Sequence, residues 1–178
     1  IGTRDGLSLY NRRQNEFSNF YYKKEGQNVA VMNIVPLHKD WLMIGTAGGI
    51  LLFDVKGGHF MSDTLSTALH LLKPSTLVRQ GDCVYIGTES GVYTYSLQDG
   101  TLKKLVELPT KARIHGILCQ MFNRIWIATE GSGLYMYDIK AKKLKNYRYE
   151  DKTSGLNSNY VRSLALDQEN RLWVGTYS

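Results

Sequence analysis

Short apolar runs, separated by turns rich in glycine and asparagine, recur along the whole chain. None of them sustains the 3.6-residue period of an amphipathic helix, and only residues 65–72 favour a helical turn. Two runs, 50–53 and 125–128, are apolar at every position, so we expect both faces of those strands to be covered. The pattern predicts an all-β fold. In the clearest unit the expected strands are about 114–120, 124–129, 134–138 and 144–148.

One tripeptide type, Ile or Val followed by Gly or Ala and then Thr, occurs five times. Its threonines are Thr3, Thr46, Thr88, Thr129 and Thr176, spaced by 43, 42, 41 and 47 residues. Each of the first four copies leads through a short polar loop to a glycine, then to an alternating run that ends in an aromatic residue. Four short antiparallel strands at this period are typical of a β-propeller blade.

The turns and the packing positions of the repeat follow from residue type. The loop glycines should adopt positive φ, as should Asn123 and Asn170 in their turns. Pro74 predicts a distorted start to one inner strand, and Asp54 and Asp138 should cap turns. The loop glycines are Gly6, Gly49, Gly91 and Gly133. A bulky residue before each tripeptide should pack between blades, at Met43, Tyr85, Trp126 and Trp173.

The repeat also divides the chain into blades. Ile1 is not a methionine and Ser178 lies inside the repeated motif, so we expect a piece of a larger protein with both ends cutting through a blade. Such an arc would leave apolar faces uncovered, and alone it should aggregate or pair with another copy or with missing blades. The expected units are the end of one blade at 1–28, blades at 29–71, 72–112 and 113–159, and the start of another at 160–178.

Charge and cysteine content narrow the possible partners. Lys and Arg number 22 against 16 Asp and Glu, a net charge of +6, but the basic residues are scattered, which favours a solvated surface over nucleic-acid binding. No run of 18 apolar residues and no signal peptide occurs, so we expect no direct membrane contact. Cys83 and Cys119 lack the C-x-x-C spacing of metal and redox sites. Each lies in an apolar run, which favours a free thiol, and a disulfide between them is the alternative.

The last copy is the most complete. It reads Gly-Leu-Asn-Ser-Asn-Tyr-Val-Arg-Ser-Leu over 155–164 and Asp-Gln-Glu-Asn-Arg-Leu-Trp-Val-Gly-Thr over 167–176. This resembles the two-component regulator propeller repeat, and the whole chain follows the same pattern; the WD signature does not recur, and kelch repeats run nearer 50 residues. The departures are Asn123 and Asn170 at the turn glycine, Met43 and Tyr85 at the tryptophan, and Ala128 at the tripeptide glycine.

The resemblance implies a location and a role. Proteins of this family are typically periplasmic sensor regions of hybrid two-component histidine kinases of gut Bacteroidetes, anchored in the inner membrane. They usually carry two seven-bladed propellers, so the chain would be a partial arc of a seven-bladed ring. It would detect oligosaccharides from polysaccharide breakdown and regulate transcription of their utilisation genes. Its partners would be the oligosaccharide, the remaining blades and a second subunit. The alternative is a propeller scaffold for protein–protein interaction or dimerisation without ligand contact.

Ligands of propellers usually bind where the connections between blades and the turns between second and third strands meet. Arginine can grip carboxylates or sulfates and tyrosine can stack on sugar rings, although exposed Arg and Tyr on loops are also ordinary. The candidate ligand-binding residues are Arg4, Arg113, His115, Tyr160, Arg162 and Tyr177.

An enzyme would need converging reactive groups. The sequence has no catalytic triad motif, phosphate-binding glycine loop or metal-ligand spacing, so we expect no catalytic residue, no metal and no cofactor in this segment. Acidic residues brought together by folding leave a glycoside-cleaving enzyme as a third possibility.

Overall fold

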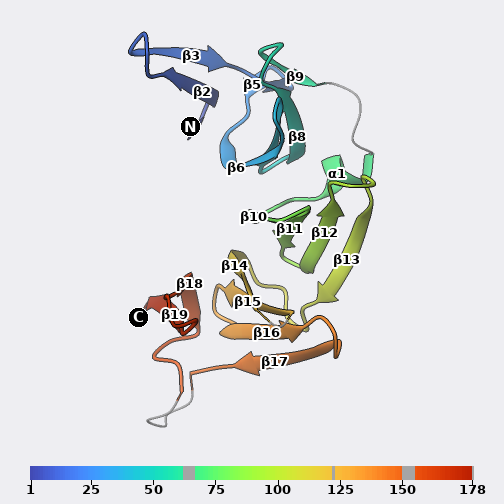
Figure 1. Ribbon diagram of the computed structural model, residues 1–178, viewed down its shortest axis with the longest axis vertical. Helices are drawn as coiled ribbons and strands as arrows, with labels where there is room; N and C mark the ends of the chain where they lie inside the picture. Colours follow the sequence, from blue (N-terminus) through green and yellow to red (C-terminus); the bar gives the residue numbers. More distant parts are fainter. Residues whose placement is uncertain (62–66, 122, 150–154, 178) are drawn as a thin grey trace.

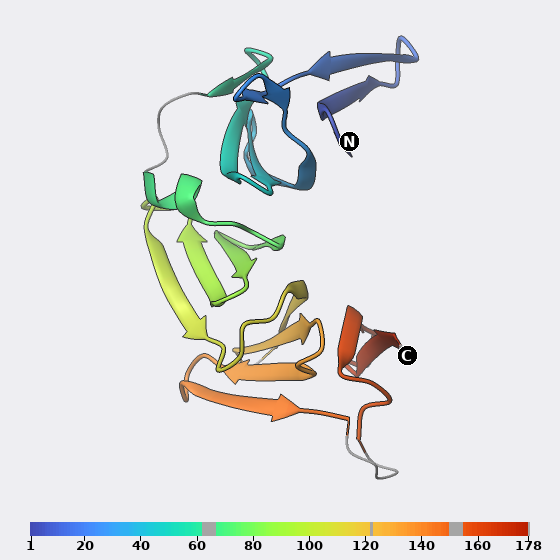
Figure 2. The same ribbon diagram turned by 180° about the vertical axis from the view of Figure 1, so that it is seen from behind.

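The computed structural model describes residues 1–61, 67–121, 123–149 and 155–177. Antiparallel sheets follow one another around an open arc, with both chain ends on its concave side (Figure 1). Figure 2 shows from behind that each sheet is a separate layer facing the next. The all-β prediction is confirmed, and the sheets are propeller blades. The number of blades in a closed ring stays a prediction.

The first sheet has three strands and the second has four. A two-stranded hairpin of β4 and β5 lies in the connection between them. The first part of the chain comprises β1 (Gly2–Thr3), β2 (Gly6–Asn11), β3 (Glu16–Phe20), β4 (Lys23–Lys24) and β5 (Gln27–Asn28). The second sheet comprises β6 (Val31–His38), β7 (Trp41–Thr46), β8 (Gly49–Asp54) and β9 (His59–Met61).

Two further four-stranded sheets and a final two-stranded one complete the described chain. The third comprises β10 (Thr76–Gln80), β11 (Cys83–Thr88), β12 (Gly91–Ser96) and β13 (Leu102–Glu107). The fourth comprises β14 (Ile114–Gln120), β15 (Arg124–Thr129), β16 (Leu134–Asp138) and β17 (Lys143–Tyr147), which corrects the predicted last strand by one residue. The last comprises β18 (Tyr160–Leu166) and β19 (Leu172–Tyr177).

One short helix, α1 (Thr67–Leu71), is the single helix among the described residues and lies within the predicted segment 65–72, whose residues 65 and 66 are outside the described chain. No helix in the described part of the chain is long and apolar enough to cross a membrane. β10 begins two residues after Pro74 and pairs with β11 without a register shift, and the distorted start stays a prediction.

The core consists of apolar layers between successive sheets. One layer joins β6–β9 to β10–β13, and a second joins β10–β13 to β14–β17. The four residues of the apolar run in β8 are all buried, from 3% to 7% exposed, so both faces of that strand are covered as predicted. Met43 is fully buried, and Tyr85 and Trp126 pack between sheets. Trp173 is 61% exposed because no sheet of the described chain lies beyond β19.

The threonine of the repeated tripeptide fixes the turn that follows it. In four copies its Oγ1 donates a hydrogen bond to the carbonyl of the loop glycine, at 2.6–3.0 Å. The predicted positive φ is found at all four loop glycines and at Asn123 and Asn170. Gly91 has a φ of 138°, and a Cβ there would overlap the carbonyl oxygen of Val106. The repeat therefore specifies a tight turn at the same end of each sheet.

The glycine of the tripeptide sets how closely the sheets approach. A Cβ on Gly87 would lie 2.7 Å from Thr76 Cγ2 and 3.0 Å from Ile114 Cγ2 of the next sheet. A side chain at Gly45 would also be crowded, because a Cβ there would lie 3.2 Å from Leu77 Cδ1 of the next sheet. At these two positions glycine therefore allows the inner strand of the next sheet to pack closely against the second strand.

Candidate functional site

A β-bulge presents one side chain at the start of several inner strands. In β14 the pairing passes from Ile114 opposite Thr129 to Gly116 opposite Ala128, which leaves His115 as the extra residue. In β18 the same shift leaves Arg162 as the extra residue. Bulges re-aim side chains at the rims of sheets. Both residues are therefore directed to one rim by the same backbone feature.

His115 and Arg162 meet at Glu130, in the turn between β15 and β16. Arg162 Nη1 lies 3.0 Å from His115 Nε2, and Arg162 Nη2 lies 3.8 Å from Glu130 Oε1. His115 Nε2 is 3.6 Å from Glu130 Oε2. The three side chains come from different strands or turns and close a polar group that we call the rim cluster.

The protonation state of His115 follows from these contacts. A guanidinium can only donate, so His115 Nε2 accepts from Arg162 and the ring proton resides on Nδ1. Burial, the positive charge of Arg162 and that of Arg113 lower the pKa of His115, against an opposing effect of Glu130. His115 is therefore neutral near pH 7, and the ion pair of the cluster is between Arg162 and Glu130.

Two tyrosines border the rim cluster. The Arg162 guanidinium carbon lies 5.8 Å from the centre of the Tyr177 ring, within the range of a cation–π contact. The Tyr160 ring lies beside Gly131, where a Cβ would be 3.6 Å from Tyr160 Cζ. Both tyrosines are about half exposed or more, at 47% for Tyr160 and 64% for Tyr177. The cluster thus combines donors, acceptors and accessible aromatic faces.

The structure brings together four of the six candidate residues: His115, Arg162, Tyr160 and Tyr177. Arg113 adjoins them through its carbonyl oxygen, which accepts a hydrogen bond from the Glu130 amide at 2.9 Å. Arg4 lies in the turn between β1 and β2 in the first sheet and contacts none of the others. Glu130 was missed as a site residue; its place in the same turn as Gly131 was the available signal.

A cavity of about 650 Å³ lies next to Arg113, between the second and third sheets. Its charged lining residues are Lys73, Lys111, Arg113 and Glu89. None except Arg113 was a sequence candidate. Glu89 lies in the repeated turn after Thr88, whereas the three cations come from the longer connections before β10 and β14, where the repeat specifies no residue type.

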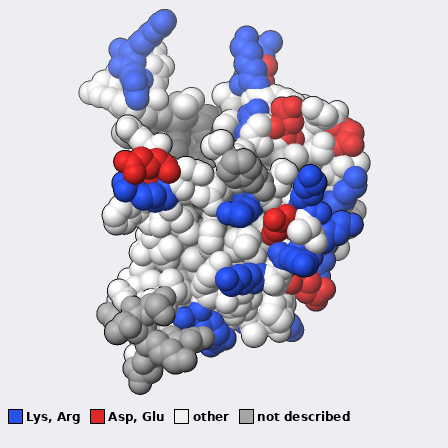
Figure 3. Space-filling model, turned by 60° about the horizontal axis from the view of Figure 1, so that its bottom comes forward, with Lys and Arg blue, Asp and Glu red and all other residues white. Residues whose placement is uncertain are grey.

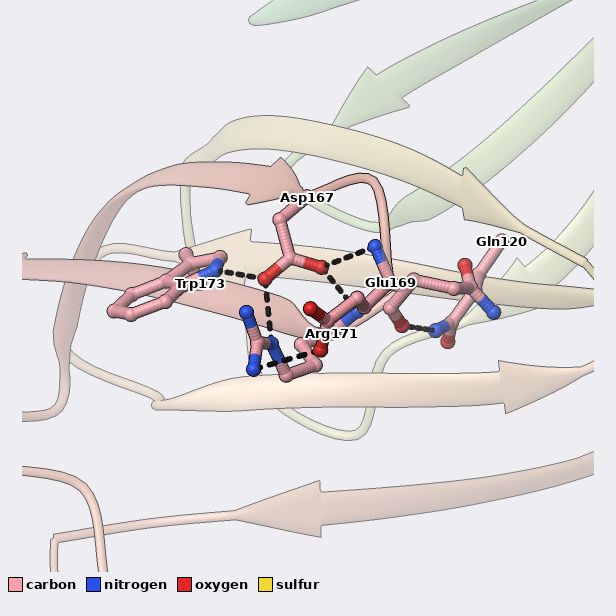
Figure 4. Close-up of polar contacts among 6 residues, drawn as sticks. Gln120, Asp167, Glu169, Arg171 and Trp173 are labelled. Atoms are coloured by element: carbon pink, nitrogen blue, oxygen red, sulfur yellow. Dashed lines mark hydrogen bonds and ion pairs between the residues drawn. The ribbon is translucent and has the colours of Figure 1, made fainter.

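The most extensive polar network lies at the other end of β18 and β19 and is structural (Figure 4). Asp167 Oδ2 accepts hydrogen bonds from Trp173 Nε1 at 2.8 Å and Arg171 Nε at 2.7 Å. Its Oδ1 accepts from the amides of Glu169 and Arg171. These donors lower the pKa of Asp167 to about 2.

The preceding sheet repeats this arrangement with a neutral side chain. Gln120 occupies the place of Asp167, and its Oε1 accepts from Trp126 Nε1 at 2.7 Å. Its Nε2 donates to the carbonyl of Asn170 in the next sheet, at 2.9 Å (Figure 4). Asp167 therefore joins the indole to its own turn, whereas Gln120 joins the indole of its sheet to the turn of the next sheet. The predicted capping roles are confirmed at Asp54 and Asp138, which accept turn amides.

Cys83 and Cys119 are free thiols in the structure, so the disulfide alternative is not realised. Burial raises the pKa of Cys119 to about 11, and burial with the nearby thiols raises that of its hydrogen-bond partner Tyr85 to about 12. Such a thiol is a poor nucleophile and a poor metal ligand. Among the described residues no group of three or more His, Cys, Asp or Glu side chains could hold a metal ion.

The charged groups on one face of the molecule agree with the scattered basic residues expected from the sequence. On the face shown in Figure 3, Lys and Arg are spread over the surface and alternate with Asp and Glu on its right-hand side. A nucleic-acid site would gather positive charge in a continuous groove or stripe. This face shows no such continuous stripe among the described residues.

Residues 155–178 match the family model described as two component regulator propeller. The last repeat of the chain is therefore a two-component regulator propeller repeat, as its motif predicted. No curated protein sequence matches the chain.

Solved structures share the fold. The chain is 22% identical, with a TM-score of 0.80, to the extracellular domain of a hybrid two component system from B. thetaiotaomicron, covering 98% of this chain and 24% of that one. A second such domain from that organism is 24% identical, with a TM-score of 0.54 and coverage of 98% and 30%.

PorZ, a surface component of the type-IX secretion system of Porphyromonas gingivalis, is also similar. It is 19% identical, with a TM-score of 0.69, and the match covers 98% of this chain and 28% of PorZ. The chain thus spans between about a quarter and a third of these structures. At these identities the likeness concerns the fold.

Proposed function

We propose that this chain is a segment of the extracellular ligand-sensing domain of a hybrid two-component histidine kinase. The regulator propeller repeat at 155–178 and the similarity in fold to extracellular domains of such systems support the assignment. The segment would lie in the periplasm, in a protein anchored in the inner membrane. It would carry no catalytic residue of its own, because the kinase would be a separate domain.

The three four-stranded sheets would be complete blades of a seven-bladed ring, with the first and last sheets as parts of flanking blades. This assignment places the boundaries at 28/29, 71/72, 112/113 and 159/160. The apolar side chains that the end sheets leave exposed support it, because further blades would cover them. These include Leu9, Phe17 and Trp173, at 50%, 58% and 61% exposure.

The ligand would be an oligosaccharide released from a polysaccharide, and its binding would regulate transcription of the genes that use it. The rim cluster carries this proposal. Arg162 and Glu130 supply charged hydrogen-bonding groups, and the exposed ring of Tyr177 lies beside them. Planar guanidinium donors and aromatic faces are complementary to the hydroxyl groups and the apolar faces of sugar rings. Binding would signal by favouring one arrangement of two sensor subunits.

Calorimetry of the protein that carries this chain, against oligosaccharides from several polysaccharides, tests the proposal. Arg162→Ala should weaken the binding of a recognised oligosaccharide by about tenfold, the effect of losing one charge-assisted hydrogen bond. His115→Ala should also weaken it, because His115 Nε2 accepts from the Arg162 guanidinium and so holds it in place. Arg124→Ala is the matched control, because Arg124 begins the strand that ends near Glu130 and so lies at its far end. Heat from none of the oligosaccharides would refute the proposal.

A scaffold that joins propellers without contacting ligand is the alternative, and the exposed apolar residues of the end sheets favour it. The same variants distinguish the ligand-sensing role from the scaffold role. If binding occurs and Arg113→Ala, His115→Ala and Arg162→Ala all leave it unchanged, the rim is not the site and the scaffold role is supported. Chromatography of the calorimetry samples would reveal an enzyme through shortened oligosaccharides.

A further inference from the structure

The cavity between the second and third sheets opens on the same side as the rim cluster. Ala47 from the β7–β8 turn and Glu89 from the β11–β12 turn line it. Lys111 and Arg113, from the connection before β14, line it as well. Its volume of about 650 Å³ falls within the ~300–1,000 Å³ typical of sites for small organic ligands. It is therefore large enough for more than a simple ion.

The charge around this cavity is unbalanced. Lys73, Lys111 and Arg113 line it together with a single carboxylate, that of Glu89. Among the residues that the structure describes, none of the three cations has an ion-pair partner within 4 Å. All three are exposed, so their charges are already hydrated and available to a ligand. An anionic group entering the cavity would meet a net positive field.

The remaining wall is suited to a sugar ring. Tyr93 and Leu72 are half-buried, and Met32, the extra residue of the bulge in β6, is 42% exposed. Ser75 and Ser90 add hydroxyl groups to the lining. A saccharide has apolar ring faces and many hydroxyls, whereas a free phosphate or sulfate would leave this apolar wall unused.

We propose that this cavity binds an anionic saccharide. Its carboxylate or sulfate would be held by Lys73, Lys111 and Arg113, and its ring would lie against Tyr93. Arg113 would link the cavity to the rim cluster, since its carbonyl oxygen accepts the Glu130 amide. The inference rests on the proposed function, because it assigns the ligand class to the same sensor face.

Matched pairs of probes test the charge requirement by calorimetry on the protein that carries this chain. Trigalacturonic acid is compared with its neutral methyl ester, and a sulfated disaccharide with its desulfated form. We expect an acidic probe to bind about tenfold or more tightly than its neutral partner. The preference should decrease as salt is raised. A preference for the acid in the first pair alone would indicate a uronate ligand, and a preference in the second pair alone would indicate a sulfated one.

A double variant locates the effect. Lys73→Gln with Lys111→Gln should reduce the preference for the acidic probe to about twofold or less, whereas Lys56→Gln, on an exposed lysine of the β8–β9 turn, should leave it unchanged. Equal binding of acidic and neutral probes, or a preference that survives in the double variant, would overturn this inference alone. Absence of binding by every saccharide would overturn it together with the proposed function.

Discussion

Replacing Gly87 by alanine tests whether the tripeptide glycine sets the distance between sheets. The added Cβ would lie 2.7 Å from Thr76 Cγ2, directly across the strand pair, and 3.0 Å from Ile114 Cγ2 in the next sheet. Thr76 is 7% exposed and Ile114 is fully buried, so neither can move into solvent. Overpacking of this kind costs ~1–3 kcal/mol. We expect Gly87→Ala to lower the free energy of unfolding by that amount.

The fourth sheet provides a matched control. There the tripeptide residue is Ala128, and the residue opposite it is Gly116. A Cβ on Gly116 would lie 3.9 Å from that of Ala128, an ordinary contact. Gly116→Ala should therefore change stability by less than ~0.5 kcal/mol. Where the tripeptide residue is glycine, the residue opposite has a side chain: Asn33 faces Gly45, Thr76 faces Gly87 and Ser163 faces Gly175.

Urea unfolding of the protein that carries this chain, followed by tryptophan fluorescence, measures both variants. Gly87→Ala should lower the midpoint and Gly116→Ala should not. Adding Thr76→Gly to Gly87→Ala should recover only part of the loss, because the contact with Ile114 remains. A wild-type midpoint for Gly87→Ala, or an equal loss for Gly116→Ala, would refute the explanation by close approach.

Three further predictions concern titratable groups. Cys119, with its pKa near 11, should be alkylated at pH 8 about 100-fold more slowly than an ordinary thiol, and peptide mapping after a timed iodoacetamide pulse checks this. Asp167, with its pKa near 2, stabilises the fold above its unfolded pKa of ~3.9 and loses this effect as pH falls toward 2, so Asp167→Asn should lower the melting temperature at pH 6 more than at pH 2. The pKa of His115 is lowered, so stability from its neutral form is present above ~6.5 and is lost as pH falls below that value; an NMR titration midpoint at or above 6.5 would contradict it.

The fold was predictable because the repeat fixes several local features that agree with one another. The positive φ of the loop glycines and the covering of both faces of β8 were predicted from residue type, and both are found in the structure; the hydrogen bond from the repeated threonine to the loop glycine was not predicted and explains why that residue recurs. The exposure of Trp173 was not predictable in the same way. A tryptophan at this position is buried only if another sheet follows, so its environment depends on chain beyond the motif.

The candidate site was predictable only in part. The repeat locates the start of each inner strand, and the residues at these starts were expected to lie on one rim. This expectation selected His115 and Arg162. Their meeting with Glu130 depends on how two neighbouring sheets are rotated and on a bulge in each inner strand. Neither feature leaves a signal in residue type. The cavity was missed for a related reason, since its cations come from connections of differing length.

The residue at the β-bulge of an inner strand connects the fold to the proposed function, because its backbone position recurs while its side chain differs. The same bulge occurs in three inner strands, and its extra residue is Met32 in β6, His115 in β14 and Arg162 in β18. These three sheets therefore each present one side chain at the same rim, with a different chemistry in each, whereas β10 pairs with β11 without a bulge. Ile114 and Val161, which precede the bulge residue in β14 and β18, are fully buried, whereas the bulge residues themselves are half-buried at His115 and exposed at Met32 and Arg162. In the three sheets that have it, the bulge residue is therefore a position where the ligand preference can differ while the pairing of the inner strand stays the same.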